Sequence, residues 1–179
     1  MMFSTNFTEV EIANYTGLMA AFIKLQREAF ISQAAPLPES RQEMFRPFFN
    51  EGILKTTLFF HKTDGPIDSP DFLEELHQKG VAFSLDRLKA ITFLDLVVSF
   101  EELDPRVQFH ELVHTVQFQK MGLKQFANKY FRGLLRTGKY EKIPLEVNAH
   151  LLDDAYSKDP SQPFSVESEV QKWINENRF

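Results

Sequence analysis

The chain of 179 residues has the composition of an ordinary globular protein, with 43% hydrophobic and 25% charged residues. It contains no cysteine, which excludes a disulfide scaffold, a cysteine-ligated zinc site, an iron–sulfur centre and thiol catalysis. Its net charge of -5 lacks the basic footprint of a protein that binds nucleic acid. Its 19 phenylalanines indicate a core rich in aromatic rings.

The sequence also contains no pattern typical of a membrane span. The longest apolar stretch near the N-terminus, residues 17–25, contains Lys24 and is flanked by Glu9, Glu11 and Glu28. A secretory signal would begin with basic residues and continue with an uninterrupted apolar region, and neither is present. We therefore expect no membrane partner and a cytoplasmic location.

The N-terminal half alternates predicted helices with two predicted strands. Apolar residues at spacings of three and four predict a helix over residues 8–31. Branched and aromatic residues predict a strand over 56–61, and the run ITFLDLVVS predicts the strongest strand of the chain over 91–99. Between them we expect a break at 34–38, a short helix over 39–48, and a helix with Ser69 as N-cap and Pro70 as first residue, ending at Gly80. Residues 81–90 are ambiguous.

Capping residues divide the C-terminal half into four predicted helices. Asp104 and Pro105 fit the N-cap and first position of a helix that ends at Gly122. The others are expected over 123–137, over about 144–157, and after the N-cap Ser165. Because there is no internal repeat and no low-complexity linker, we expect a single α+β domain over residues 1–179, mostly helical, with a small sheet before the 104–122 helix.

The helix that begins at Asp104 carries the motif His110-Glu111-Leu112-Val113-His114, an H-E-x-x-H pattern. Residues four apart lie about 40° apart around a helix and roughly 6 Å apart along it, so both imidazoles can reach one ion. Glu111 points about 100° away from His110, which suits it to accept a proton from a water on that ion. Zinc favours imidazole and carboxylate ligands, and three protein ligands leave a position open for water. The alternative is two ordinary, partly buried histidines.

A third ligand is expected from a neighbouring element. The candidates downstream are Glu141, Glu146, His150, Asp153 and Asp154. Glu146 is favoured because it lies in the first turn of the helix that starts at Pro144, and because the small Ala149 allows that helix to approach closely. His150, one turn beyond Glu146, is the main competitor. Glu146 could otherwise be a carboxylate that only complements the helix dipole.

Other polar residues are weaker candidates for the site. Gln117, on the face of His110, could hydrogen-bond to a group that supports the metal ligands. Asp153, two turns beyond Glu146, could orient a ligand histidine. His150 could contact substrate. Three possible donors to an oxyanion are Tyr130, Arg132 and Tyr140. For each of these residues an ordinary polar role is the alternative.

Residues 91–156 resemble the compact gluzincin-type, zincin-like metallopeptidase domains found in many bacterial proteins whose substrates are unassigned. The matching segments are ITF, HELVHTVQF, QFANKYFRGL and YEKIPLEVNAH, the last with an E-x-x-A pattern. The resemblance implies zinc held by His110, His114 and Glu146, with Glu111 as the water-activating residue. Compared with larger gluzincins, a whole extra predicted helix lies between His114 and Glu146, and no separate substrate domain is evident.

Together these features predict a zinc-dependent hydrolase, foremost a peptidase acting on a peptide or small amide. We expect a peptide to lie extended beside the strand over 91–99. One alternative is a zinc hydrolase of a non-peptide amide or ester. The other is a binding domain without catalysis, in which a fourth protein ligand closes the metal site. His150 and Asp153 are the candidates for that ligand.

Overall fold

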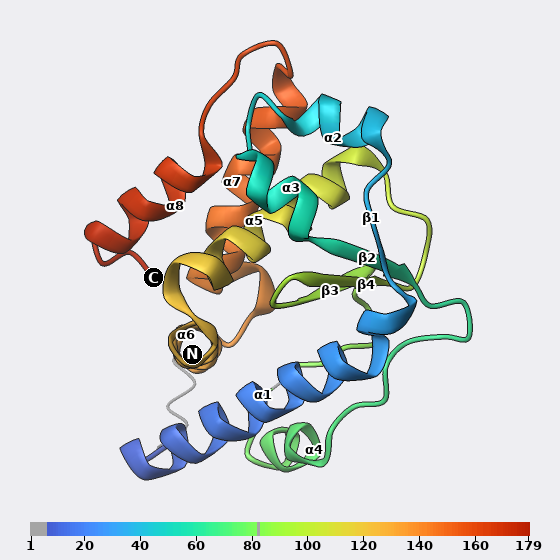
Figure 1. Ribbon diagram of the computed structural model, residues 1–179. Helices are drawn as coiled ribbons and strands as arrows, with labels where there is room; N and C mark the ends of the chain where they lie inside the picture. Colours follow the sequence, from blue (N-terminus) through green and yellow to red (C-terminus); the bar gives the residue numbers. More distant parts are fainter. Residues whose placement is uncertain (1–6, 82) are drawn as a thin grey trace.

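The computed structural model describes residues 7–81 and 83–179, and it confirms the predicted α+β fold (Figure 1). In chain order the elements are α1 (Glu9–Phe30), the short helix η1 (Ile31–Gln33), β1 (Ala35–Pro36), α2 (Glu39–Phe45), α3 (Glu51–Thr56), β2 (Leu58–His61), α4 (Asp71–Gln78), β3 (Ala90–Phe93), β4 (Leu96–Ser99), α5 (Pro105–Met121), α6 (Leu123–Thr137), the short helix η2 (Tyr140–Lys142), α7 (Pro144–Lys158) and α8 (Val166–Asn175). None of the described helices combines the length and apolar character needed to cross a membrane.

The four strands form one small mixed sheet in the order β1-β2-β4-β3. β2 and β4 are parallel, whereas β1 pairs with β2 and β3 pairs with β4 in antiparallel fashion. In the view of Figure 1, α1 runs below the sheet and α5 lies above it. β3 therefore forms one edge of the sheet among the described strands, next to the helix that carries the H-E-x-x-H motif.

The single strand expected over residues 91–99 is in fact the hairpin β3–β4, so that prediction was wrong. Leu94 has a φ of 65° and begins the tight turn between the two strands. The carboxylate of Asp95, the other turn residue, accepts hydrogen bonds from Arg27 of α1, one of them 2.9 Å long. Local sequence suggested a continuous strand because the turn contains no glycine, and it is α1 that supplies the partner of Asp95.

Other differences from the predicted elements are small. The helix expected over 39–48 ends earlier, at Phe45, and is followed by the unpredicted α3. α3 begins where the side chain of Asn50 accepts a 2.9 Å hydrogen bond from the backbone N–H of Ile53. Pro70 rather than Ser69 is the N-cap of α4. The predicted caps Asp104 and Ser165 are confirmed.

The buried side chains form two clusters on either side of α5. One fills the space between the sheet, α1, α4 and α6, and the other lies between α3, α5, α7 and α8. The second cluster confirms the expected aromatic core: Phe109 of α5 contacts Phe45, Phe48, Phe49 and Tyr156, with ring centroids 4.5–5.8 Å apart. Burial on both sides fixes α5 firmly, which gives the motif a rigid support.

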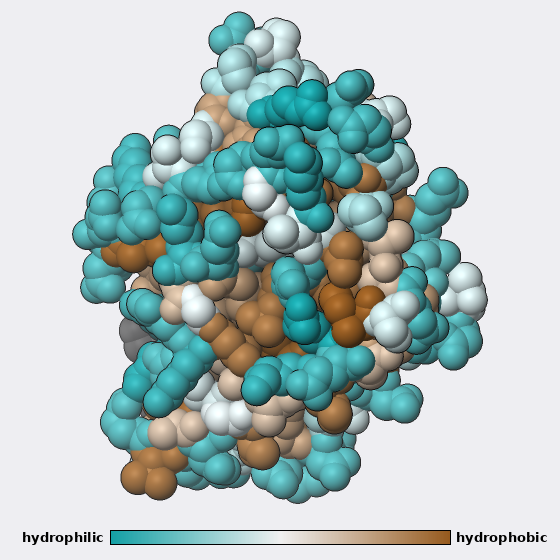
Figure 2. Space-filling model, in the orientation of Figure 1, coloured by the Kyte–Doolittle hydropathy of each residue, from teal (hydrophilic) through white to brown (hydrophobic). Residues whose placement is uncertain are grey.

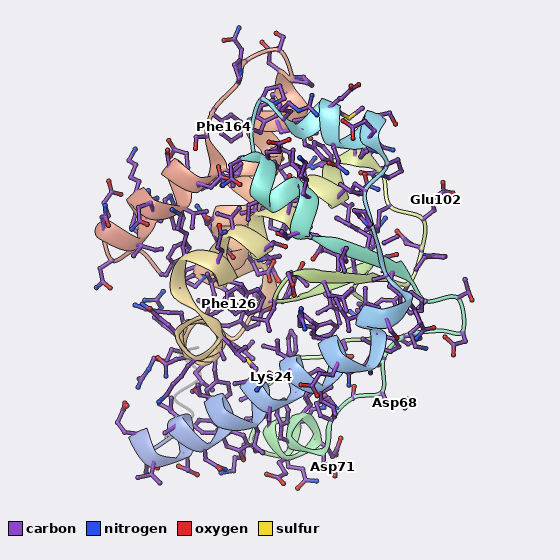
Figure 3. The ribbon with its side chains drawn as sticks, viewed as in Figure 1. Lys24, Asp68, Asp71, Glu102, Phe126 and Phe164 are labelled. Atoms are coloured by element: carbon purple, nitrogen blue, oxygen red, sulfur yellow. The ribbon has the colours of Figure 1, made fainter. Side chains whose placement is uncertain are left out.

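The surface has the usual mixed character. Charged side chains such as Asp71 and Glu102 point outward, whereas Phe126 and Phe164 lie among the helices (Figure 3). On the face seen in Figure 2, apolar residues come to the surface in a hollow near the centre, surrounded by hydrophilic residues.

Candidate metal centre

The two motif histidines meet the carboxylate of α7 inside the protein. His110 Nε2 and His114 Nε2 are 3.1 Å apart, and Glu146 Oε2 lies 3.3 Å from the first and 3.4 Å from the second. A tetrahedral zinc ion with bonds of about 2.0–2.1 Å would hold its ligand atoms about 3.3–3.4 Å apart. The three atoms therefore have the spacing that a metal ion requires. Among the described residues, no fourth histidine or carboxylate joins this group.

The opposite nitrogen of each imidazole is engaged by a hydrogen-bond acceptor. His110 Nδ1 lies 2.8 Å from Asp153 Oδ2, a carboxylate that can only accept when ionised. His114 Nδ1 lies 2.9 Å from Gln117 Oε1. With protons on both Nδ1 atoms, the lone pairs of both Nε2 atoms point into the cluster, as metal binding requires.

The orientation of Gln117 follows from its second set of contacts. Its Nε2 donates to the backbone oxygen of Leu145 at 3.0 Å and to Asn148 Oδ1 at 2.9 Å. Both partners belong to α7, so the amide oxygen must face His114 on α5. Gln117 thereby links the helix of the two histidines to the helix of Glu146.

We expect Gln117→Leu to weaken zinc binding by about 10–100-fold, the usual cost of removing a partner that orients a metal ligand. Leucine cannot accept from His114 Nδ1, which frees the imidazole to turn. Gln119→Leu, at an exposed position two residues further along α5, is the matched control and should keep wild-type affinity. Competition with a chromophoric chelator measures both, and equal affinities for the two variants would contradict the role of Gln117.

Asp153 joins His110 to a network at the edge of the site. Besides His110, it contacts Arg106 Nε at 2.7 Å and His150 Nδ1 at 3.2 Å. His150 is exposed and lies, with Asp153, on the Nδ1 side of His110. Neither side chain belongs to the group formed by the Nε2 atoms and Glu146. This arrangement places Asp153 where it can orient His110, and it does not place His150 as the third or fourth ligand.

Glu146 reaches the cluster because α7 begins close to α6. A Cβ at Gly133 would lie only 2.8 Å from Pro144 Cδ, so glycine is needed where the two helices meet. The hydroxyl of Tyr130 on α6 donates a 2.9 Å hydrogen bond to Glu146 Oε1. This bond engages the oxygen that does not face the histidines and fixes the carboxylate for binding through Oε2.

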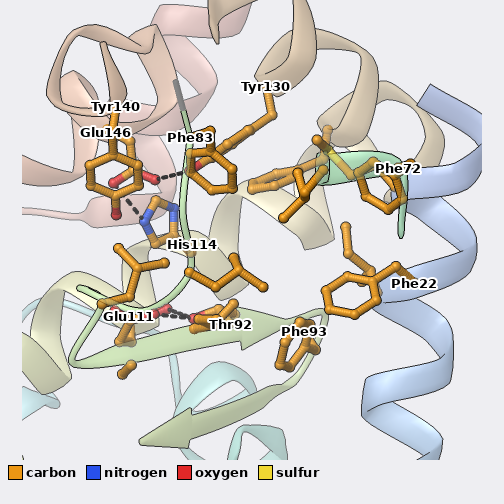
Figure 4. A pocket seen from close by; sticks show the side chains of 18 residues that line it. Phe22, Phe72, Phe83, Thr92, Phe93, Glu111, His114, Tyr130, Tyr140 and Glu146 are labelled. Atoms are coloured by element: carbon orange, nitrogen blue, oxygen red, sulfur yellow. Dashed lines mark hydrogen bonds and ion pairs between the residues drawn. The ribbon is translucent and has the colours of Figure 1, made fainter. Parts of the chain in front are cut away.

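Glu111 lies against the edge strand of the sheet. Thr92 of β3 donates a 2.6 Å hydrogen bond from Oγ1 to Glu111 Oε2. Glu111, His114 and Glu146 line the same cavity, with Glu111 and Thr92 below His114 in Figure 4. Thr92 was not predicted as a site residue, because its contact with Glu111 is made between distant segments and a lone threonine in a strand carries no distinguishing signal.

Together, the contacts of His110, His114 and Glu146 shift the pKa values of these side chains more than burial does, and they favour the charged forms. Burial disfavours a charged imidazole, but hydrogen bonds to Asp153 and Glu146 raise the pKa of His110 to about 10. Burial likewise disfavours a charged Glu146, yet the charge of His114 and hydrogen bonds from both histidines hold its pKa well below the usual value. Without a metal, the raised pKa of His110 favours its protonated form, and a cation competes with that proton for the same nitrogen.

The remaining sequence candidates lie in different surroundings. Tyr140 lines the cavity with Glu146, and burial followed by the charge of Glu146 raises the pKa of its phenol well above the usual value. Arg132 instead pairs with Glu9 of α1 and is not among the cavity residues, so it is badly placed to stabilise an oxyanion. Glu141 is exposed, and Asp154 pairs with Arg106.

Comparison of the chain with protein-family models, with curated proteins and with solved structures gives no match.

Proposed function

We propose that the protein is a zinc-dependent hydrolase, and more specifically a metallopeptidase of the gluzincin type. The observation that carries the proposal is the convergence of His110 Nε2, His114 Nε2 and Glu146 Oε2 at 3.1–3.4 Å, beside Glu111 and an apolar cavity. Three ligands of this kind favour zinc and leave one coordination position for water or substrate. The resemblance of residues 91–156 to gluzincin-type domains suggests the same ligand set. We also propose that the protein is located in the cytoplasm.

Each residue has a defined part in the proposed reaction. When bound, zinc would polarise the scissile carbonyl and lower the pKa of a water toward about 7. Glu111 accepts the proton of the attacking water and passes it to the leaving amine. Thr92 holds one carboxylate oxygen of Glu111 and leaves the other for that proton. Tyr140 stays protonated because of its raised pKa and can donate to the developing oxyanion.

The edge position of β3 favours a peptide over other amides. The segment expected to bind substrate, residues 91–99, contains parts of both β3 and β4. β4 is central in the sheet and paired on both sides, whereas β3 pairs only with β4 among the described strands. An extended peptide can add to such an edge through backbone hydrogen bonds. The proposed peptide-binding edge of the sheet is therefore limited to β3, residues 90–93. A non-peptide amide or ester would not use that edge.

A closed, purely structural metal site is the alternative from a different class. It would need a fourth protein ligand, and the two side chains suggested for that position, His150 and Asp153, lie beyond the opposite nitrogen of His110. This geometry supports a hydrolase over a binding domain without catalysis.

The first test of the proposal is the metal content of the purified protein. We expect one zinc per chain by elemental analysis after gentle purification, and an affinity that falls at acidic pH because protons compete for the imidazole nitrogens. His114→Ala should lose tight binding, since two ligands remain. A wild-type protein that contains no transition metal and takes up none on titration would rule out the proposed function.

A further inference from the structure

The cavity beside the candidate metal centre has two chemically different ends. Its volume is about 90 Å³, several times the roughly 10–15 Å³ that a single water needs. At one end lie the side chains of Glu111, His114 and Glu146, and at the other lie Phe22, Phe72 and Phe93 (Figure 4). The cavity therefore leads from the candidate catalytic groups into the apolar core.

The far end of the cavity is formed by α1 and α4 together with Phe93 of β3. Phe22 of α1 contacts Phe72 of α4 and Phe93 of β3, with ring centroids 6.3 Å and 6.0 Å apart. Met19 and Ile23 of α1 complete this wall. These two helices lie outside the 91–156 region that resembles metallopeptidase domains, so this part of the cavity wall is not covered by the resemblance.

The charges around the cavity limit what it can hold. The described residues that line it include the carboxylates of Glu111 and Glu146 but no lysine or arginine. Two of its hydroxyls are already engaged, that of Thr92 by Glu111 and that of Tyr130 by Glu146. At the far end, away from His114, an anionic group would have no lysine or arginine among the described lining residues to pair with, and a polar group would remain without a partner.

We propose that this cavity binds a bulky, uncharged apolar side chain of a peptide whose backbone pairs with the edge of β3 beside Glu111. The assignment rests on the proposed hydrolase function and names its substrate class. Because a phenyl or isobutyl group loses water-exposed surface on entering such a cavity, the preference over a methyl group should be about 10–200-fold. A peptide with an acidic side chain at this position should be rejected.

The cavity can be tested by binding, without turnover, on the zinc-loaded protein. Acetohydroxamate, which has only a methyl group, reports an accessible zinc ion. 3-Phenylpropionohydroxamate adds a phenyl group, and succinate monohydroxamate adds a carboxylate at a similar distance. Calorimetry should show the phenyl compound binding at least about tenfold more tightly than acetohydroxamate, and the succinate compound binding no more tightly.

Two variants on α1 test whether the tighter binding of the phenyl compound comes from the cavity. Met19→Trp fills the cavity and should remove the advantage of the phenyl compound while leaving acetohydroxamate affinity unchanged. Leu18→Trp, at a partly exposed neighbouring position outside the cavity, should keep that advantage. If Met19→Trp does not fold, as judged by zinc content, Leu88→Trp at a half-buried lining position takes its place.

The outcomes separate this proposal from the function on which it rests. Failure of acetohydroxamate to bind zinc-loaded protein would reject the accessible metal site itself. Binding of acetohydroxamate with no gain from the phenyl group, or a gain that Met19→Trp retains, would overturn the apolar cavity alone. Cleavage of a mixed peptide library, mapped by mass spectrometry, should place leucine, phenylalanine or methionine beside the cut bond. Cleavage without that preference, or no cleavage, would overturn the assigned peptide class.

Discussion

Glu111→Gln should reduce hydrolysis by about 10²–10⁴-fold while the protein still binds one zinc per chain, because the amide cannot accept a proton from water. Glutamine has nearly the size of glutamate, and its carbonyl oxygen can still accept the 2.6 Å hydrogen bond from Thr92. The packing around the site should therefore survive. The measurement is the release of new amino groups from a peptide mixture, together with metal content by elemental analysis.

A matched control distinguishes this loss from a general effect of removing a carboxylate. Glu141→Gln changes an exposed glutamate in η2, outside the cavity, and should retain wild-type activity. Wild-type activity in Glu111→Gln would show that the proposed mechanism is wrong. A wild-type protein that binds zinc but cleaves neither peptides nor simple amides and esters would instead favour the binding domain without catalysis.

Glu146→Gln should lower zinc affinity strongly, because it removes an anionic ligand. The loss should exceed the about 10–100-fold decrease that follows from removing a residue that only orients a ligand. His150→Ala should change it little: the exposed His150 ring packs against that of His110, with centroids 4.5 Å apart, but its Nδ1 lies beside Asp153 and not among the atoms that face Glu146. Both residues lie on α7 one turn apart, which makes the pair a direct comparison. Chelator competition gives both affinities, and a large loss in His150→Ala with little change in Glu146→Gln would reverse the ligand assignment.

The motif itself was predictable because its geometry is local. His110 and His114 lie one turn apart on a helix whose N-cap, Asp104, and terminal Gly122 can be read from the sequence. The side chain of Asp104 accepts from the backbone N–H of Val107 at 3.0 Å, as the capping pattern implies. Such contacts depend on residues within one or two turns, so periodicity and caps are sufficient to predict them.

The strand before the motif shows where local reasoning fails. ITFLDLVVS has the composition of one continuous strand, yet it turns at Leu94 and Asp95. The partner of Asp95 is Arg27, 68 positions earlier in the chain. Nothing within the nine residues indicates that partner, and without the turn β3 would not lie at the sheet edge beside Glu111.

Local patterns in the sequence were sufficient to predict the helical C-terminal half, the shared face of His110 and His114, and the small set of residues from which a third ligand could come. The packing of separate elements, which those patterns do not reveal, makes Glu146 face both Nε2 atoms and places His150 on the Nδ1 side of His110. The same holds for the contacts of Thr92 with Glu111 and of Gln117 with α7, and for the cavity that extends from Glu111 to α1 and α4. The reason is physical: helix periodicity fixes neighbours three and four residues apart, whereas these contacts depend on how separate elements pack.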